Sequence, residues 1–339
     1  MAEAGGGVSN SPSSEDNDDN NDEQDNSAVL QGRGVLCLVA FLYGTLNVSL
    51  RFVFQLPEPP SAAALSAVRG WLASLCFVPL LLVNNKNKNS TPATSQEKTS
   101  SSSITMAGLE LAVWNFLAQG LLNIGLLSTG SARASFLTQT SVLLTPLISS
   151  VFGQPVPSSV WWGGGVALVG LTLLSGGGGG AGASMMAFSS GDWFVLGGAL
   201  SWSFYLFRLG KMATNKKNSF NEINLQAIKT MLVAVLYSVW WGWSISTVPI
   251  AALWSSLSWM TNLTAWVALF YSALGPGAIA DVLQQQSQKH VSASEANIIL
   301  SMEPVFTALC ARVLLGEITT VTETIGGGLI LMAALIATR

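Results

Sequence analysis

The sequence predicts an all-α polytopic membrane protein, with ten transmembrane helices arranged as two inverted five-helix repeats. Three observations lead to this fold class: an apolar composition, a tandem repeat, and an uneven distribution of basic residues. Half of the 339 residues are hydrophobic and 10% are charged, whereas about a quarter of the residues are charged in soluble domains. This composition is typical of a chain that lies largely within a lipid bilayer.

The repeat becomes visible when the chain is aligned with itself at a shift of 160 to 163 residues. The matching positions are 153–154 with 316–317, 163–165 with 326–328, and Arg69 with Lys229. Because two separate regions match at nearly equal shifts, chance is a poor explanation, and the chain is interpreted as a tandem repeat.

Composition divides the chain into four parts. Residues 1–28 contain eight of the eighteen acids and no basic residue, so we expect a disordered acidic tail. This tail lacks the features of a cleaved targeting signal. The first repeat is predicted over 29–175 and the second over 190–339. The glycine-rich residues 176–189 are predicted to form the linker between them.

Each repeat contains five apolar segments of about twenty residues, long enough to cross about 30 Å of hydrocarbon. The predicted spans are 30–54, 61–83, 104–127, 131–152, 157–175, 190–211, 222–245, 262–284, 292–315 and 318–338. The polar run 84–103 is predicted to be a loop. Aromatic and glutamine residues in 246–265 and 281–291 favour interfacial segments there.

The basic residues predict the orientation of the chain in the membrane. With a cytoplasmic N-terminus, ten of the fifteen Lys and Arg residues fall on the inside. They are Arg33, Lys86, Lys88, Lys98, Arg208, Lys211, Lys216, Lys217, Lys289 and Arg339. Both termini are then inside, and five helices per repeat make the second repeat inverted relative to the first. Inverted repeats are typical of secondary transporters, which bind substrate near the midplane between the repeats.

Several motifs resemble those of the EamA family of the drug/metabolite transporter superfamily. Residues 43–47 (YGTLN) are similar to a Trp-Gly-x-x-Asn motif in the first helix. Residues 131–134 (SARA) and 292–296 (SASEA) are similar to the openings of helices four and nine. Residues 302–306 (MEPVF) and 315–317 (LGE) are similar to the most recognisable motif of the second half.

The resemblance covers roughly residues 30–338. It implies ten helices that move metabolites across a membrane, with the fifth and tenth helices peripheral to a central cavity. The first half departs from the motif, because Thr140-Ser141 stands in place of Glu-Pro and Gln154 in place of Glu.

Two basic residues within apolar segments are candidates for substrate contact. Arg69 lies in the second predicted helix and Lys229 occupies the equivalent position of the seventh. Charges inside a bilayer are costly and frequently functional, so this pair is predicted to line one cavity and to meet an anionic or polar substrate. The alternative is that each long side chain extends to the nearer membrane surface.

Glu303 is the acid that helix-rise arithmetic places near the bilayer centre, about 17 Å from the start of its helix. It is a candidate proton carrier, and Lys229 is a candidate partner for it. The alternative is a structural group beside Pro304, which leaves a backbone carbonyl one turn earlier without its usual donor. Asp281 and Glu295 lie nearer the inner end and are predicted to be interfacial.

Polar and aromatic residues within the predicted helices supply further candidates for a substrate pocket. Those selected as site residues are Asn47, Asn115, Trp202, Tyr205 and Asn297. Each of them could instead serve packing or hydrogen bonding between helices. The glycine-rich helices 157–175 and 318–338 allow close helix packing, either within the fold or in a homodimer.

Enzyme classes find little support in the sequence. His290 is the single histidine, and no phosphate loop or dinucleotide motif follows a strand. We expect no catalytic residues, metal, cofactor or nucleic-acid partner. The predicted function is secondary transport of a small solute by alternating access. The alternatives are an intramembrane enzyme that uses Glu303 and a non-transporting membrane receptor. The partners are then the solute and the bilayer, in either a plasma membrane or an organelle envelope such as that of a plastid.

Overall fold

The computed structural model of the chain describes residues 15–54, 59–89, 101–125, 137–176, 190–214, 222–247, 257–315 and 321–338. This part of the chain is helical and contains no strand. The predicted opening of the fourth helix at 131–134, the linker 177–189 and the Gly316-Glu317 pair lie outside the described residues.

The described helices follow the predicted spans. In the first repeat they are α1 (Glu15–Phe54), α2 (Ala62–Asn89), α3 (Ser101–Gly125), α5 (Ser141–Val151) and α6 (Ser158–Gly176). In the second repeat they are α7 (Ser190–Ala213), α8 (Glu222–Ser246), a short 3₁₀ helix (Ser258–Thr261), α10 (Leu263–Ala273), a π-helical segment (Leu274–Ile279), α11 (Ala280–Ser287), α12 (Ala293–Leu300), α13 (Glu303–Leu315) and α14 (Val321–Ala337).

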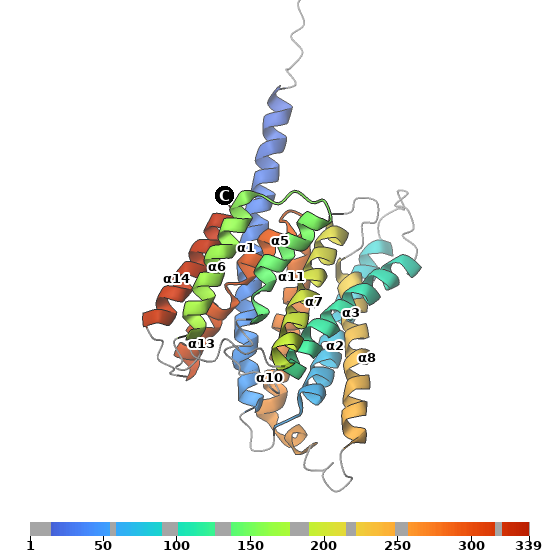
Figure 1. The fold of residues 1–339 in the computed structure, drawn as a ribbon. Helices are drawn as coiled ribbons and strands as arrows, with labels where there is room; N and C mark the ends of the chain where they lie inside the picture. Colours follow the sequence, from blue (N-terminus) through green and yellow to red (C-terminus); the bar gives the residue numbers. More distant parts are fainter. Residues whose placement is uncertain are drawn as a thin grey trace, which may run out of the picture.

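The first helix corrects one prediction. The sequence predicts disorder over residues 1–28, but α1 begins at Glu15 and continues without a break into the first predicted span. Figure 1 shows this helix extending well beyond the bundle. Elongating an existing helix costs much less than nucleating a new one. Acidic residues near a helix N-terminus also interact favourably with the helix dipole.

Four helical stretches among the described residues are long and apolar enough to cross a membrane: Ser27–Leu46, Ala62–Pro79, Glu222–Ser246 and Leu263–Ser287. Three shorter apolar helices, Ser141–Val151, Ser158–Leu173 and Thr324–Ala337, belong to other predicted spans. The start of α1 and the end of α14 lie at the same end of the bundle (Figure 1), as the orientation predicted from the basic residues requires.

The packing of the helices follows the two repeats. The equivalent helices α2 and α8 pack against each other, as do α6 and α14. In the same way, α3 packs on α7, and the equivalent segments α10 and α11 pack on α1. Reciprocal packing of this kind is expected of two copies related by a pseudo-two-fold axis. The central apolar cluster includes Leu36, Leu111, Leu206, Leu225 and Ile299 from both repeats.

Glycines allow two of these contacts to be close. A Cβ on Gly44 of α1 would lie 2.8 Å from the Cβ of Phe306 on α13, which is too short for any other residue without a shift. A Cβ on Gly170 of α6 would lie 2.7 Å from the carbonyl oxygen of Gly326 on α14. The glycine-rich faces of α6 and α14 therefore pack within the chain, and the homodimer through these helices stays a prediction.

The ninth predicted helix is broken. The sequence predicts one helix over 292–315, but α12 ends at Leu300 and α13 begins at Glu303. Pro304 has no N–H with which to bond the carbonyl of Leu300, so the α-helical hydrogen-bonding pattern is interrupted there. Residues 301–302, between α12 and α13, form a turn. Residues 139–140, which lie 162 positions earlier in the chain, form a turn before α5. Breaks at corresponding positions of two repeats are frequent near transporter binding sites.

Candidate functional site

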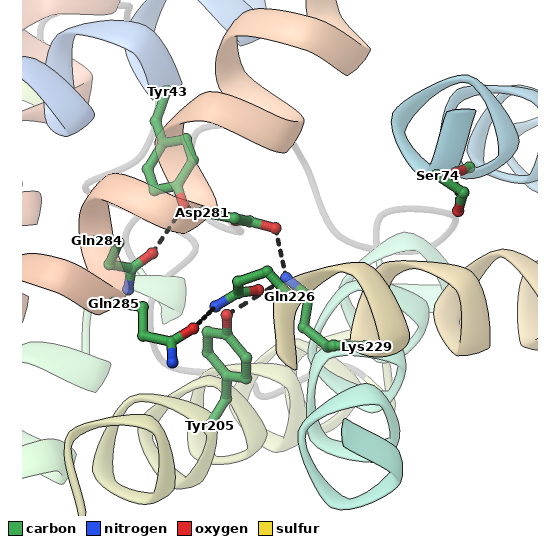
Figure 2. Close-up of polar contacts among 9 residues, drawn as sticks. Tyr43, Ser74, Tyr205, Gln226, Lys229, Asp281, Gln284 and Gln285 are labelled. Atoms are coloured by element: carbon green, nitrogen blue, oxygen red, sulfur yellow. Dashed lines mark hydrogen bonds and ion pairs between the residues drawn. The ribbon is translucent and has the colours of Figure 1, made fainter. Parts of the chain in front are cut away.

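The centre of the candidate site is an ion pair between Lys229 on α8 and Asp281 on α11 (Figure 2). The Lys229 side chain is 3% exposed and that of Asp281 is 18% exposed. Burying two charges away from water is costly, and their attraction offsets this cost when the pair is well placed and hydrogen-bonded. An intramembrane ion pair of this kind is therefore a functional candidate.

Local backbone geometry determines where Asp281 lies. Residues 274–279 form a π-helical segment that contains Gly275, Pro276 and Gly277, and Asp281 follows it as the second residue of α11. A π-helical segment changes the rotation of the helix that follows it, and such segments occur frequently at functional sites. The segment gives α11 its orientation, in which Asp281 contacts α8.

Two tyrosines from different repeats complete the centre of the site. The hydroxyl of Tyr43 on α1 donates a hydrogen bond that is shared between Gln284 Oε1, at 2.7 Å, and Asp281 Oδ1, at 3.1 Å. On the other side, the ammonium of Lys229 donates to the Tyr205 hydroxyl of α7 at 3.5 Å and lies 5.6 Å from the centre of the Tyr205 ring. The first repeat thus contacts the carboxylate, and the second repeat surrounds the ammonium.

The amides of neighbouring glutamines extend the network along α8 and α11. Gln226 donates through Nε2 to Gln285 Oε1 at 2.9 Å, and both side chains are buried. Among the described residues, the buried Nε2 of Gln284 has no hydrogen-bond partner. Since buried donors are normally satisfied, this amide has a free bond for a water molecule or a solute.

Arg69 enters the same site from α2. Its Nε donates to the carbonyl oxygen of Ser272 at 3.4 Å, and its guanidinium interacts electrostatically with Asp281 and Tyr43. The predicted equivalent pair, Arg69 and Lys229, therefore lies around one carboxylate.

The other predicted site residues lie in different environments. Trp202 is half-buried and stacks on Tyr205, with ring centres 5.1 Å apart. Asn297 is buried and donates to the carbonyl oxygen of Ser141 at 2.6 Å and to Thr145 Oγ1 at 2.9 Å. These bonds join α12 to α5, so Asn297 serves packing between the repeats.

Two further candidates lie on α1 and α3. Asn115 is half-buried on α3. Asn47 belongs to α1, but its side chain lies outside the described residues. Neither residue has a described contact with the Lys229–Asp281 pair.

The structure corrects the predicted partner of Lys229. The sequence proposes Glu303, but Lys229 pairs with Asp281. Glu303 is the first residue of α13, where an acid interacts favourably with the helix dipole, and it interacts electrostatically with Tyr43. The position of Asp281 near the membrane interface stays a prediction. The apolar sequence before Asp281, together with the Gly-Pro-Gly run within it, was the available signal.

Three ion pairs lie toward the end of the bundle that holds the chain termini. Arg33 on α1 pairs with Glu295 on α12 at 2.7 Å, and Arg208 on α7 pairs with Glu110 on α3, Nη2 to Oε2, at 2.7 Å. Each of these two pairs joins one repeat to the other. The third pair joins Lys289 to Glu222 within the second repeat. The position of Glu295 near the inner membrane interface stays a prediction.

A metal centre is not apparent in this arrangement. Within the described ranges, no three His, Cys, Asp or Glu side chains come together in a way that could hold a metal ion. The chemistry that the site offers is hydrogen bonding and charge pairing: two cationic groups, one central carboxylate, two phenols and several amides.

An all-helical bundle of two reciprocally packed repeats, with a buried ion pair where they meet, defines the class of inverted-repeat membrane transporters. Comparison with known proteins gives the family. The EamA-like transporter family matches residues 31–176 and 189–339, one match for each repeat. The chain belongs to this family and is a membrane transporter.

One relative agrees with this assignment, and one solved structure has a similar fold. An uncharacterised transporter from Archaeoglobus fulgidus is 25% identical over 306 residues, which cover 89% of this chain and 83% of the relative. A solved crystal structure is 17% identical and superposes with a TM-score of 0.68 over 92% of this chain and 96% of the other. At this identity, the structural likeness concerns the fold alone.

Proposed function

We propose that the chain moves a small solute by alternating access, through a central site at which Tyr43 and Arg69 of the first repeat meet Tyr205, Lys229 and Asp281 of the second. The observation that carries this proposal is the convergence of both repeats on one buried ion pair. Rocking of one repeat against the other would change the contacts of every group in this site, so solute binding and rocking are coupled.

The packing of α11 supports a structure that is closed at its inner end. In the second repeat, α11 packs on α7 and α8. The equivalent packing in the first repeat would bring the outer end of α3 onto α1 and α2. Among the described residues, α3 makes few contacts with either helix. Two inverted repeats exchange these arrangements when access alternates. In the other state, α3 would therefore close the outer end while α11 separates from α8.

The Lys229–Asp281 pair acts as an inner gate in this mechanism. While the pair is intact, α8 and α11 are held together beside the Gln226–Gln285 hydrogen bond. A solute that contacts Lys229 or Asp281 competes with this pairing and reduces the energy that holds the gate closed. The ion pair Arg33–Glu295 would have to separate during the same motion, because it joins the two repeats.

The same geometry favours transport over intramembrane catalysis. An enzyme that uses Glu303 requires a second catalytic group beside it, and Lys229, the predicted partner, is paired with Asp281. We propose that the chain is not an enzyme.

Uptake by the purified chain in sealed lipid vesicles tests this proposal. A screen would offer radiolabelled amino acids, organic acids, nucleosides and amines, with and without a pH gradient. We expect uptake of at least one solute class that saturates with concentration and is lost in Lys229→Met. Lys211→Gln, which removes an exposed charge at the end of α7, serves as the control. Saturable uptake that is unchanged in Lys229→Met would refute the proposed site.

A further inference from the structure

Arg69 is the charged group of the site whose bonding is incomplete. Its guanidinium carries five N–H donors. Among the described residues, Nε alone makes a hydrogen bond, the 3.4 Å contact with Ser272, and no carboxylate oxygen lies within 4.0 Å of the guanidinium. The residue is half-buried. Among the described residues, the two amino groups of Arg69 are thus donors without a hydrogen-bond partner.

The π-helical segment opposite Arg69 determines where its guanidinium lies. Pro276 lacks the N–H that an α-helix would direct at the carbonyl of Ser272, and this carbonyl accepts from Arg69 Nε. A Cβ on Gly277 would lie 3.2 Å from that same carbonyl oxygen and 3.9 Å from Arg69 Nη2. A larger residue at 277 would therefore crowd the guanidinium. The π-helical segment holds Nε and leaves the amino groups room.

The charges around the guanidinium favour an anion. The groups that act on Arg69 electrostatically are Asp281, Tyr237 and Tyr43. Asp281 is already paired with Lys229. Two cations thus share one carboxylate, which leaves one positive charge uncompensated among these groups. A charge within the bilayer is costly unless it is paired, so an anion that neutralises Arg69 is strongly favoured there.

We infer that the transported solute carries a single carboxylate and that this carboxylate binds the amino groups of Arg69. The inference rests on the proposed transport function and names its substrate class. A carboxylate matches the planar fork of a guanidinium with two parallel hydrogen bonds. The single negative charge of a carboxylate balances the one uncompensated positive charge of Arg69, Lys229 and Asp281, whereas a phosphate dianion would leave these groups with a net negative charge.

Matched acid and amide pairs test the inference on the full chain, purified in detergent. The probes are acetate, phenylacetate and phenylalanine, each with its amide, together with phenyl phosphate. Ligand-induced thermal stabilisation and uptake into vesicles are measured for each. We expect at least one acid to stabilise the chain and to be transported at least about tenfold more effectively than its amide, since a charge-assisted hydrogen bond is lost in the amide.

The variants separate a binding role of Arg69 from a structural one. In Arg69→Gln the difference between acid and amide should disappear. Arg69→Lys keeps a point charge without the fork, so it should retain part of the acid preference. If Arg69→Gln does not accumulate in the membrane, Arg69→Lys serves as the test instead. A full preference for the acid over the amide in Arg69→Lys contradicts the inference. Lys211→Gln, a loss of charge outside the site, should leave the preference intact.

Other outcomes overturn the inference without touching the transport function. If amides or amines are taken up as well as the acids, the chain transports solutes and the carboxylate assignment is wrong. Stronger stabilisation by phenyl phosphate than by every acid would assign the site to phosphate. An acid preference that persists undiminished in Arg69→Gln would exclude Arg69 as the binding group. If no acid probe is taken up while the wider screen finds saturable uptake of another solute class, the carboxylate assignment is wrong and the transport function stands.

Discussion

Removing one partner of the Lys229–Asp281 pair should cost far more stability than removing both. Asp281→Asn leaves the ammonium of Lys229, whose side chain is 3% exposed, beside the neutral amide and the Tyr205 hydroxyl at 3.5 Å, without a negative charge to pair with. An uncompensated buried charge of this kind costs about 3–5 kcal/mol of the free energy of unfolding. Lys229→Met should cost less, because the Asp281 side chain is 18% exposed and keeps its contact with Tyr43.

The double variant decides whether the pair itself is responsible. Replacing both members of a buried pair is frequently close to neutral, so Lys229→Met/Asp281→Asn should be more stable than Asp281→Asn by at least about 2 kcal/mol. The measurement is a double-mutant cycle on the free energy of unfolding in detergent micelles. All three variants should lose uptake, because each removes a group of the site. Costs that simply add in the double variant would refute the reasoning.

The surface pair Lys289–Glu222 provides the matched control. Its lysine side chain is 41% exposed, and exposed pairs contribute about 0–1 kcal/mol. Glu222→Gln should therefore change the free energy of unfolding by no more than this amount. A loss as large as that of Asp281→Asn would show that burial is not what makes the central pair costly to break.

Three further predictions concern positions away from the pair. Gly170→Leu should greatly reduce the folded protein recovered from membranes, because a Cβ there would lie 2.7 Å from the α14 backbone. The control Gly165→Leu has open space around it and should be recovered normally. Equal recovery of the two variants would contradict the packing of α6 on α14. Asn297→Ala should lower the free energy of unfolding by about 1–3 kcal/mol through two lost buried hydrogen bonds, with KM for uptake unchanged; an altered KM would place Asn297 in the binding site. Glu303→Gln should accumulate in the membrane and lose the pH dependence of uptake between about pH 5 and 8; a wild-type profile at the wild-type rate would make Glu303 purely structural.

The sequence by itself determined the class of fold. The length of each apolar segment, the shift of about 160 residues between repeats and the positions of basic residues are all local properties of the chain, and bilayer thickness converts them into helices and orientation. Arg69 and Lys229 were identifiable for the same reason. A charge inside an apolar segment is visible without knowing what lies opposite it.

Only the tertiary structure decided which groups meet. Distance along a helix predicted that Lys229 could reach Glu303, but this arithmetic contains no information on the direction in which either side chain points. The π-helical segment before α11 and the break before α13 changed those directions, and Lys229 is paired with Asp281 as a result. Asn297 likewise found its partner 156 residues away, on α5. Partners across a helical bundle depend on the rotation and packing of helices that are distant in sequence, and these are properties of the folded chain as a whole.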